Sequence, residues 1–228
     1  MNARTLPAWP YPFWIAHRGA GRLAPENTLA AFRLGAQHGW RMFECDAKLS
    51  SDGVVFLLHD ATLERTTDGA GSAGARPVPP LAGGGGFFRP TGCPRDIEIS
   101  PAPGREAAIA AALAALAARL WQGAAAPPLL TSFQPAALAA AAQTAPQLPR
   151  GLLLDALRDG WLEQARQLGC VAVVCQHALW DAGTVGQVRA AGLRALSYTV
   201  NDEWAAERLI RLGTDGVVTD RVDLFSPA

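Results

Sequence analysis

The chain alternates short apolar runs with longer segments in which apolar residues recur every three or four positions. Short apolar runs bounded by turn residues are typical of buried strands, and the longer spacing predicts helices that cover a sheet. The apolar runs lie at 13–16, 42–49, 54–58, 96–99, 129–133, 150–154, 171–176, 195–200 and 216–219, and the helical segments at 27–38, 105–121, 135–143, 161–168, 184–191 and 204–212. The chain is therefore expected to consist of repeated strand and helix units.

A strong turn signal, Ser-Asp-Gly at 51–53, separates the second and third apolar runs. These two runs are expected to pair as a β-hairpin. A turn centred between Asp52 and Gly53 places Asp46 opposite His59 on the neighbouring strand. Glu44 points to the same face as Asp46, because side chains alternate along a strand. The hairpin therefore predicts that two carboxylates and an imidazole converge.

Eight strands result when the first arm of the hairpin is counted as one strand of a larger sheet. Eight strand and helix units in 228 residues predict an α/β fold, the TIM (β/α)8 barrel, with its active site at the carboxyl ends of the strands and the hairpin on that face. The doubly wound open sheet is the competing fold, since alternation alone does not separate the two. Nothing marks a linker, so residues 1–228 are expected to form a single domain.

The composition limits the partners that this chain can have. Twenty basic residues balance twenty acidic ones, so no broad positive field favours nucleic acid. The first twelve residues lack a signal-peptide pattern, and no apolar run reaches about 18 residues without a break or a charge. We therefore expect a cytoplasmic protein without stable membrane insertion; its oligomeric state stays open. Cys45, Cys93, Cys170 and Cys175 lack metal-type spacing and are expected to be free thiols.

The residues with acid-base potential gather near the beginning of the chain. His17 and Arg18 close the first strand, which suits phosphate chemistry, and His59 follows the hairpin. Either histidine alone could equally be an ordinary hydrogen-bonded residue or part of a polar turn. Glu44 and Asp46 differ, because two inward carboxylates in an apolar strand repel each other unless a cation or a proton compensates. A cation site is therefore favoured there.

The ordered motifs of this sequence resemble those of the glycerophosphodiester phosphodiesterases, most of all the bacterial cytoplasmic type associated with glycerol phosphate uptake. The motifs are His17-Arg18-Gly19, Ala24-Pro25-Glu26-Asn27-Thr28, Glu44-Cys45-Asp46, Asp52-Gly53, His59-Asp60, Leu63-Glu64-Arg65-Thr66-Thr67, Ile97-Glu98-Ile99, Thr131-Ser132-Phe133 and Tyr198-Thr199-Val200-Asn201. The resemblance implies a TIM-barrel phosphodiesterase that needs a divalent cation. It also implies cleavage of small glycerophosphodiesters, such as glycerophosphocholine or glycerophosphoethanolamine, to sn-glycerol 3-phosphate and an alcohol.

The chemistry of the residues agrees with the role that the resemblance implies. His17 and His59 are expected to act as general acid and general base, in an order that stays open. Arg18 would hold the phosphoryl oxygens with its planar fork. Glu44, Asp46 and Glu98 form an all-oxygen set suited to Mg²⁺ or Ca²⁺.

One residue of that set has an alternative interpretation, and other residues are expected to support the site. Glu98 could instead pair with Arg95 or Arg105. The resemblance also implies a nucleophile: a neighbouring hydroxyl of the glycerol is expected to attack the phosphorus and to form a cyclic phosphate that water then opens. The residues expected to orient the site or to line the pocket are Glu26, Asn27, Ser100, Tyr198 and Trp180.

Two departures from the family pattern keep other functions open. Ser100 stands where the family usually has lysine, and a glycine-rich stretch replaces the usual insertion between Thr67 and Asp96. Four consecutive glycines oppose a helix, so the helix after the second strand is expected to be missing, with Phe87 and Phe88 or a partner subunit covering the gap. The alternatives are a barrel that binds phosphorylated glycerol ligands with little catalysis, and a phospholipase-D-like enzyme acting on lysophospholipids at an apolar rim near Trp180 or Phe87.

Overall fold

The computed structural model describes residues 9–74 and 95–227, and its centre is a closed parallel barrel. The strands are β1 (Trp14–Ala16), β2 (Phe43–Leu49), β3 (Val55–Leu57), β4 (Arg95–Ile99), β5 (Leu129–Ser132), β6 (Arg150–Leu154), β7 (Ala172–Gln176), β8 (Arg194–Tyr198) and β9 (Gly216–Thr219). Their order is β1-β9-β8-β7-β6-β5-β4-β2-β3, and a further pairing of β1 with β2 closes the ring. The predicted TIM barrel is confirmed, and the open sheet is excluded.

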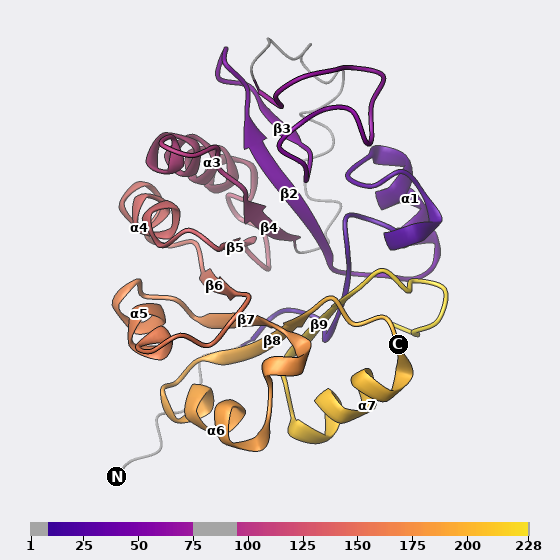
Figure 1. Ribbon diagram of the computed structural model, residues 1–228, viewed down its shortest axis with the longest axis vertical. Coiled ribbons are helices and arrows are strands. Elements are labelled where there is room, and N and C mark those ends of the chain that lie inside the picture. Colours follow the sequence, from indigo (N-terminus) through magenta and orange to yellow (C-terminus); the bar gives the residue numbers. More distant parts are fainter. Residues whose placement is uncertain (1–8, 75–94, 228) are drawn as a thin grey trace.

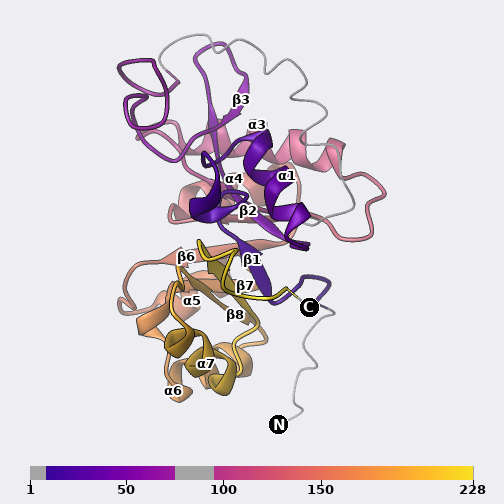
Figure 2. The ribbon, with the colours of Figure 1, turned by 90° about the vertical axis from the view of Figure 1, so that its right-hand side faces the viewer.

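Helices surround the barrel in chain order. They are α1 (Leu29–Gln37), α3 (Glu106–Leu120), α4 (Pro135–Thr144), α5 (Trp161–Gln167), α6 (Ala182–Ala190) and α7 (Glu203–Leu212), with short 3₁₀ helices η1 (Gly21–Leu23) and η2 (His177–Leu179). Figure 1 shows α3 to α7 following one another around the ring, with α1 between α7 and the hairpin. Figure 2, turned by 90°, shows the hairpin and the loop that follows it projecting from one end of the molecule.

Local sequence signals explain where several helices begin. The Thr28 hydroxyl accepts a hydrogen bond from the N–H of Ala31 and caps α1, and Asp202 caps α7 in the same way. Pro135 is the first residue of α4, where its missing N–H costs nothing. The helix predicted from residue 27 therefore begins two residues later, because residues 27 and 28 belong to the loop and the cap.

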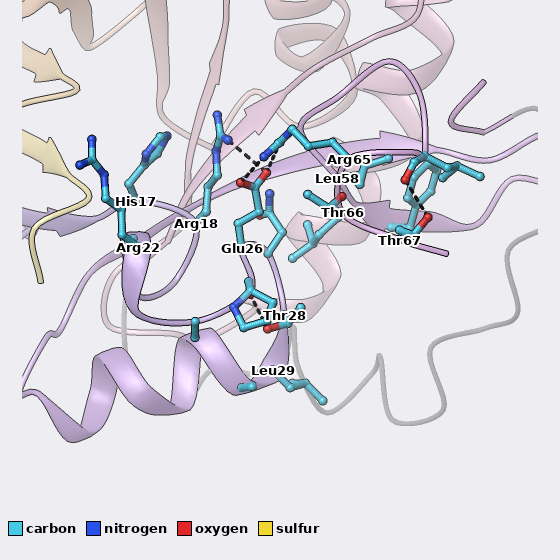
Figure 3. Close-up of a pocket in the computed structure, with 18 of the residues that line it drawn as sticks. His17, Arg18, Arg22, Glu26, Thr28, Leu29, Leu58, Arg65, Thr66 and Thr67 are labelled. Atoms are coloured by element: carbon cyan, nitrogen blue, oxygen red, sulfur yellow. Dashed lines mark hydrogen bonds and ion pairs between the residues drawn. The ribbon is translucent and has the colours of Figure 1, made fainter. Parts of the chain in front are cut away.

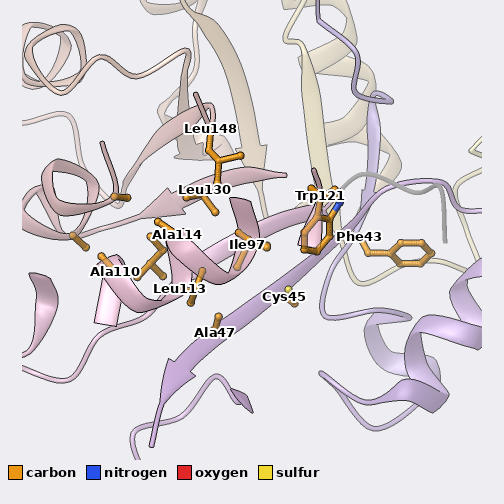
Figure 4. Close-up of a cluster of buried hydrophobic side chains, with 14 of the residues drawn as sticks. Phe43, Cys45, Ala47, Ile97, Ala110, Leu113, Ala114, Trp121, Leu130 and Leu148 are labelled. Atoms are coloured by element: carbon orange, nitrogen blue, oxygen red, sulfur yellow. The ribbon is translucent and has the colours of Figure 1, made fainter. Parts of the chain in front are cut away.

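The outward face of β2 and β4 packs against the alanine-rich helix α3. Cys45 and Ala47 point to this side, and Leu113 of α3 packs into the same cluster (Figure 4). Phe43, on the same face of β2, instead contacts Phe32 of α1. Leu113 is 3% exposed, and burial of such a side chain contributes about 1.5–3 kcal/mol. This packing holds β2 in place, so that its alternate residues face the barrel interior.

The interior of the barrel changes from apolar to polar along the strand direction. Ile15, Met42, Leu129 and other apolar side chains fill the floor. Asp96, 2% exposed, lies on β4 and accepts a hydrogen bond from Thr131 at 2.7 Å. Asp96 is the register partner of Leu129, so this carboxyl group lies at the level of the apolar floor, and Asp46 and Glu98 lie further along β2 and β4, toward the carboxyl ends of the strands.

The hairpin forms as predicted, but its register is one residue away from the predicted one. Ala47 pairs with Leu57, and the N–H of Leu58 donates to the carbonyl of Asp46, so Asp46 faces Leu58 and not His59. The turn has three residues, closed by Gly53 with φ of 82°. A left-handed glycine after a type I turn adds one residue to the loop. The predicted opposition of Asp46 and His59 is therefore wrong.

The helix predicted to be missing after the second strand, together with Phe87 and Phe88, falls in a segment that lies mostly outside the described residues. Three of the four cysteines, Cys45, Cys170 and Cys175, are buried free thiols as predicted; Cys93 lies outside the described residues. In the described part of the chain, no helix is long and apolar enough to cross a membrane.

Candidate active site

Three carboxylates meet inside the barrel, on β2 and β4. Glu44 and Asp46 share the inward face of β2, and Glu98 is the register partner of Asp46 on β4. One oxygen of each lies within 4.8 Å of the others. Burial, and then repulsion from the neighbouring carboxylates, raises the pKa of Glu44 and of Glu98. The structure thus brings together the three carboxylates that are expected from the sequence to form one oxygen set.

This cluster suits a hard divalent cation. All its donors are carboxylate oxygens, the ligands that Mg²⁺ and Ca²⁺ prefer. Oε1 of Glu44 is buried and receives no hydrogen bond from the described residues. A buried anionic oxygen without a donor is costly unless a cation or a proton reaches it. The residues that would hold the cation are Glu44, Asp46 and Glu98.

The loop that follows β1 folds back onto the cluster. The N–H of Arg18 donates to Glu44 at 3.1 Å, and Nε of Arg18 lies 3.1 Å from Asp46. Asn27 donates its amide to Asp46 at 2.8 Å and accepts the N–H of Asp46 at 3.2 Å. Arg18 and Asn27 have φ of 52° and 59°, which is uncommon for residues with side chains. The contacts hold this strained loop in place.

His17 is oriented by an aspartate that the sequence reasoning missed. Its Nδ1 lies 2.6 Å from Oδ1 of Asp220, and its Nε2 lies 3.7 Å from Glu44. The amide of Asn201 donates to the other oxygen of Asp220 at 2.9 Å. Burial raises the pKa of Asp220, but the hydrogen bond and charge of His17 and the Asn201 amide outweigh it and bring the pKa to about 2. Asp220 is therefore an ionised partner for the imidazole.

A signal for Asp220 does exist in the sequence. Asp220 follows the last strand directly, just as His17 follows the first. In a closed barrel these strands are neighbours, and Ala16 indeed pairs with Thr219. Closure therefore places the two residues side by side.

His59 lies on the rim, at the end of a chain of ion pairs. Its Nδ1 is 2.8 Å from Asp60, and Asp60 pairs with Arg65. Arg65 also donates to Glu26 at 2.6 Å and 3.0 Å, and Glu26 accepts from Arg18 at 3.1 Å. Hydrogen bonding from Arg65 and then from His59 lowers the pKa of Asp60. The two loops that carry the histidines are thus linked.

A pocket of about 1300 Å³ lies between these two loops. Figure 3 shows Arg18 and Arg65 meeting at Glu26, with His17 nearby. Apolar side chains, among them Leu29, complete the lining. The lining of this pocket therefore combines charged and apolar side chains.

Three further residues are predicted near the site, and the structure places them in different surroundings. Ser100 accepts hydrogen bonds from Nζ of Lys48, at 3.1 Å to its hydroxyl and 3.3 Å to its carbonyl. Tyr198 is half-buried, and its hydroxyl donates to the carbonyl of Leu154. Trp180 is 1% exposed, and its ring N–H donates to a backbone carbonyl. The prediction that Trp180 lines the pocket or an apolar rim is therefore wrong, because its ring is enclosed in the core.

Comparison with known proteins identifies the family. The model of the glycerophosphoryl diester phosphodiesterase family matches residues 17–83 and 91–224. The match spans most of the chain and includes every predicted catalytic and metal-binding position. The chain belongs to this family.

Solved structures and curated relatives are similar to this chain to different extents. A phosphodiesterase from Oleispira antarctica, solved with its product sn-glycerol 3-phosphate, is 31% identical; the match covers 92% of this chain and 93% of that one, with a TM-score of 0.83. A glycerophosphodiester phosphodiesterase from Agrobacterium tumefaciens is 27% identical, over 95% and 100% of the two chains, with a TM-score of 0.75. A mouse glycerophosphoinositol inositolphosphodiesterase is 53% identical over 68 residues, which is 30% of this chain and 12% of that relative. The match therefore spans only a small part of that relative's length.

Proposed function

We propose that this protein hydrolyses small glycerophosphodiesters, such as glycerophosphocholine, to sn-glycerol 3-phosphate and an alcohol in a reaction that requires Mg²⁺ or Ca²⁺. The observation that carries the proposal is the cluster of Glu44, Asp46 and Glu98 within 4.8 Å, with His17 and Arg18 beside it. The product complex of the Oleispira antarctica phosphodiesterase supports the same substrate class.

Arg18 is the residue that we assign to the phosphoryl oxygens. Its side chain is held by Glu26 at 3.1 Å and by Asp46 at 3.1 Å, so its orientation is fixed before a substrate arrives. A fixed guanidinium offers further N–H groups in a planar fork that matches a phosphate. A cation bound at the acidic cluster would neutralise phosphoryl charge as a Lewis acid.

The two histidines are assigned to proton transfer. The contact of Nδ1 with Asp220 leaves Nε2 as the nitrogen of His17 that can exchange a proton with a substrate oxygen. Asp60 leaves Nε2 of His59 for the same purpose. One imidazole takes a proton from the attacking oxygen, and the other returns one to the departing alkoxide.

A coupled assay of sn-glycerol 3-phosphate release tests this proposal. We expect release from glycerophosphocholine with Mg²⁺ or Ca²⁺, loss of release with chelator, and loss in His17→Ala and Glu44→Ala. Glu163→Ala, on an exposed side chain of α5 that pairs with Arg166, is the matched control and is expected to retain activity. No release by folded protein that still binds sn-glycerol 3-phosphate would show a binding protein instead.

The phospholipase-D-like alternative has its own outcome in the same assay. Cleavage of lysophospholipid micelles, with no activity on water-soluble diesters, would establish it. The cytoplasmic location expected from the sequence stays a prediction, which fractionation of the source cells checks.

A further inference from the structure

Lys48 is the only lysine in the sequence, which otherwise uses arginine for all nineteen of its remaining basic residues. It lies on β2, two residues beyond Asp46 and four beyond Glu44, so strand alternation turns it toward the same interior face. It is half-buried, and this burial lowers its pKa. The ammonium group of Lys48 is therefore expected on the interior side of β2, next to the acidic cluster in the direction of the carboxyl end of the strand.

The ammonium of Lys48 interacts with the acidic cluster, with the loop that carries His59 and with Ser100. Electrostatic attraction reaches Lys48 from Asp46 and Glu98 of the cluster, and from Asp60 beside His59. Its Nζ donates to the hydroxyl and the carbonyl of Ser100. Ser100 directly follows β4, so it holds the ammonium at the carboxyl ends of the strands.

The partners of Lys48 also distinguish it from the arginines of the site. Arg18 pairs with Glu26 and Asp46, and Arg65 pairs with Glu26 and Asp60. Within the described residues Lys48 makes no ion pair, and its hydrogen-bond partners are the uncharged oxygens of Ser100. An ammonium has three donors, so one stays available. A positive group that does not pair with a nearby carboxylate is suited to receive an anion.

We propose that Lys48 binds a non-bridging phosphoryl oxygen of the substrate and that Ser100 is a positioning residue that holds its ammonium for this contact. The inference rests on the proposed function and adds a phosphate ligand to it. Lys48 would meet the phosphate from the β2 side, and Arg18 from the β1 loop.

Because Lys48 is the only lysine, its side chain can be observed alone. Protein labelled with ¹³C- and ¹⁵N-lysine gives one set of side-chain signals in an NMR spectrum. Titration with inorganic phosphate or sn-glycerol 3-phosphate is expected to shift these signals to saturation, while sodium chloride at equal ionic strength does not. An unchanged lysine signal at saturating ligand would overturn the proposal.

Substitutions test the same contact through affinity. Loss of a charge-assisted hydrogen bond is expected to weaken sn-glycerol 3-phosphate binding and to raise KM about 10- to 100-fold in Lys48→Met. Ser100→Ala is expected to have a smaller effect, about 3- to 10-fold, and none when Lys48 is already methionine. Arg166→Met, which removes an exposed cation on α5, is the control. Lys48→Gln and thermal melts separate loss of binding from loss of folding.

Three results would distinguish failure of the Lys48 contact from failure of the proposed function. If Lys48 only balances the carboxylates, Lys48→Met would bind Mg²⁺ more tightly and leave phosphate affinity unchanged. If the wild type releases no sn-glycerol 3-phosphate but phosphate still shifts the lysine signal, the proposed function fails and the contact stands. If the wild type is active and neither the signal nor KM responds, the contact fails and the proposed function stands.

Discussion

Glu98→Gln is expected to stabilise the metal-free protein while it removes activity. Two unit negative charges 4.8 Å apart, the upper limit of the oxygen separations in the cluster, repel by about 3 kcal/mol at an effective dielectric constant of about 20. Protonation relieves part of this repulsion, because the pKa of Glu98 is raised. The expected net gain is therefore about 1–3 kcal/mol above about pH 8, the raised pKa of Glu98, where its carboxyl group is mostly ionised.

The sign of the pH dependence follows from the raised pKa. A carboxyl whose folded-state pKa lies above its unfolded value stabilises the fold at low pH, and this contribution is lost as the pH rises through the folded-state pKa. The advantage of Glu98→Gln over the wild type should therefore grow with pH. Glutamine keeps the shape of the side chain, so packing changes little.

Differential scanning fluorimetry with EDTA, and then with excess Mg²⁺, measures both effects. A gain of about 1–3 kcal/mol corresponds to a Tm rise of about 2–12 °C for a chain of this length. Mg²⁺ should raise the Tm of the wild type and not that of Glu98→Gln. Glu163→Gln on the exposed face of α5 is the control, with an unchanged Tm. A lower Tm of Glu98→Gln in EDTA would refute the reasoning, because it would mean that the carboxylate is already satisfied.

Three other substitutions have expected outcomes. Asp220→Asn removes the charge that orients His17, so kcat should fall about 10- to 1000-fold with little change in Tm. Steady-state kinetics measure this effect, and an unchanged kcat would rule out the orienting role. Leu113→Ala leaves a cavity beside β2 and should cost about 2–5 kcal/mol in urea unfolding, while the folded protein stays active; a cost under about 1 kcal/mol would show that α3 repacks. Burial is the main cause that raises the pKa of Asp96 from 3.8 to about 7, so the free energy of unfolding should fall as the pH rises across that interval. Asp96→Asn should flatten the dependence of the unfolding free energy on pH, measured by urea unfolding. An equally steep dependence in Asp96→Asn would contradict the raised pKa.

Much of the acidic cluster could be predicted from local sequence. Strand alternation places Glu44 and Asp46 on one face, and both lie in a run that is otherwise apolar. The barrel prediction then brought Glu98 next to them, because β2 and β4 are neighbours in the ring. These inferences need only the strand period and the order of the strands.

The parts that sequence reasoning missed depend on details beyond that pattern. A left-handed Gly53 decides the register of the hairpin and moves His59 away from the position opposite Asp46. Asp220 meets His17 only when the barrel closes. The arginine that bridges the two loops, Arg65, acts through side chains of two distant segments. Such contacts depend on how distant segments pack against one another, and they leave no repeating pattern in the local sequence.

The identity of the bond that is cleaved tests the central claim most directly. In a ³¹P NMR time course with glycerophosphocholine and Mg²⁺, the diester signal should be replaced by that of sn-glycerol 3-phosphate, with no conversion in EDTA. Formation of choline phosphate, or equal conversion in EDTA, would contradict the account.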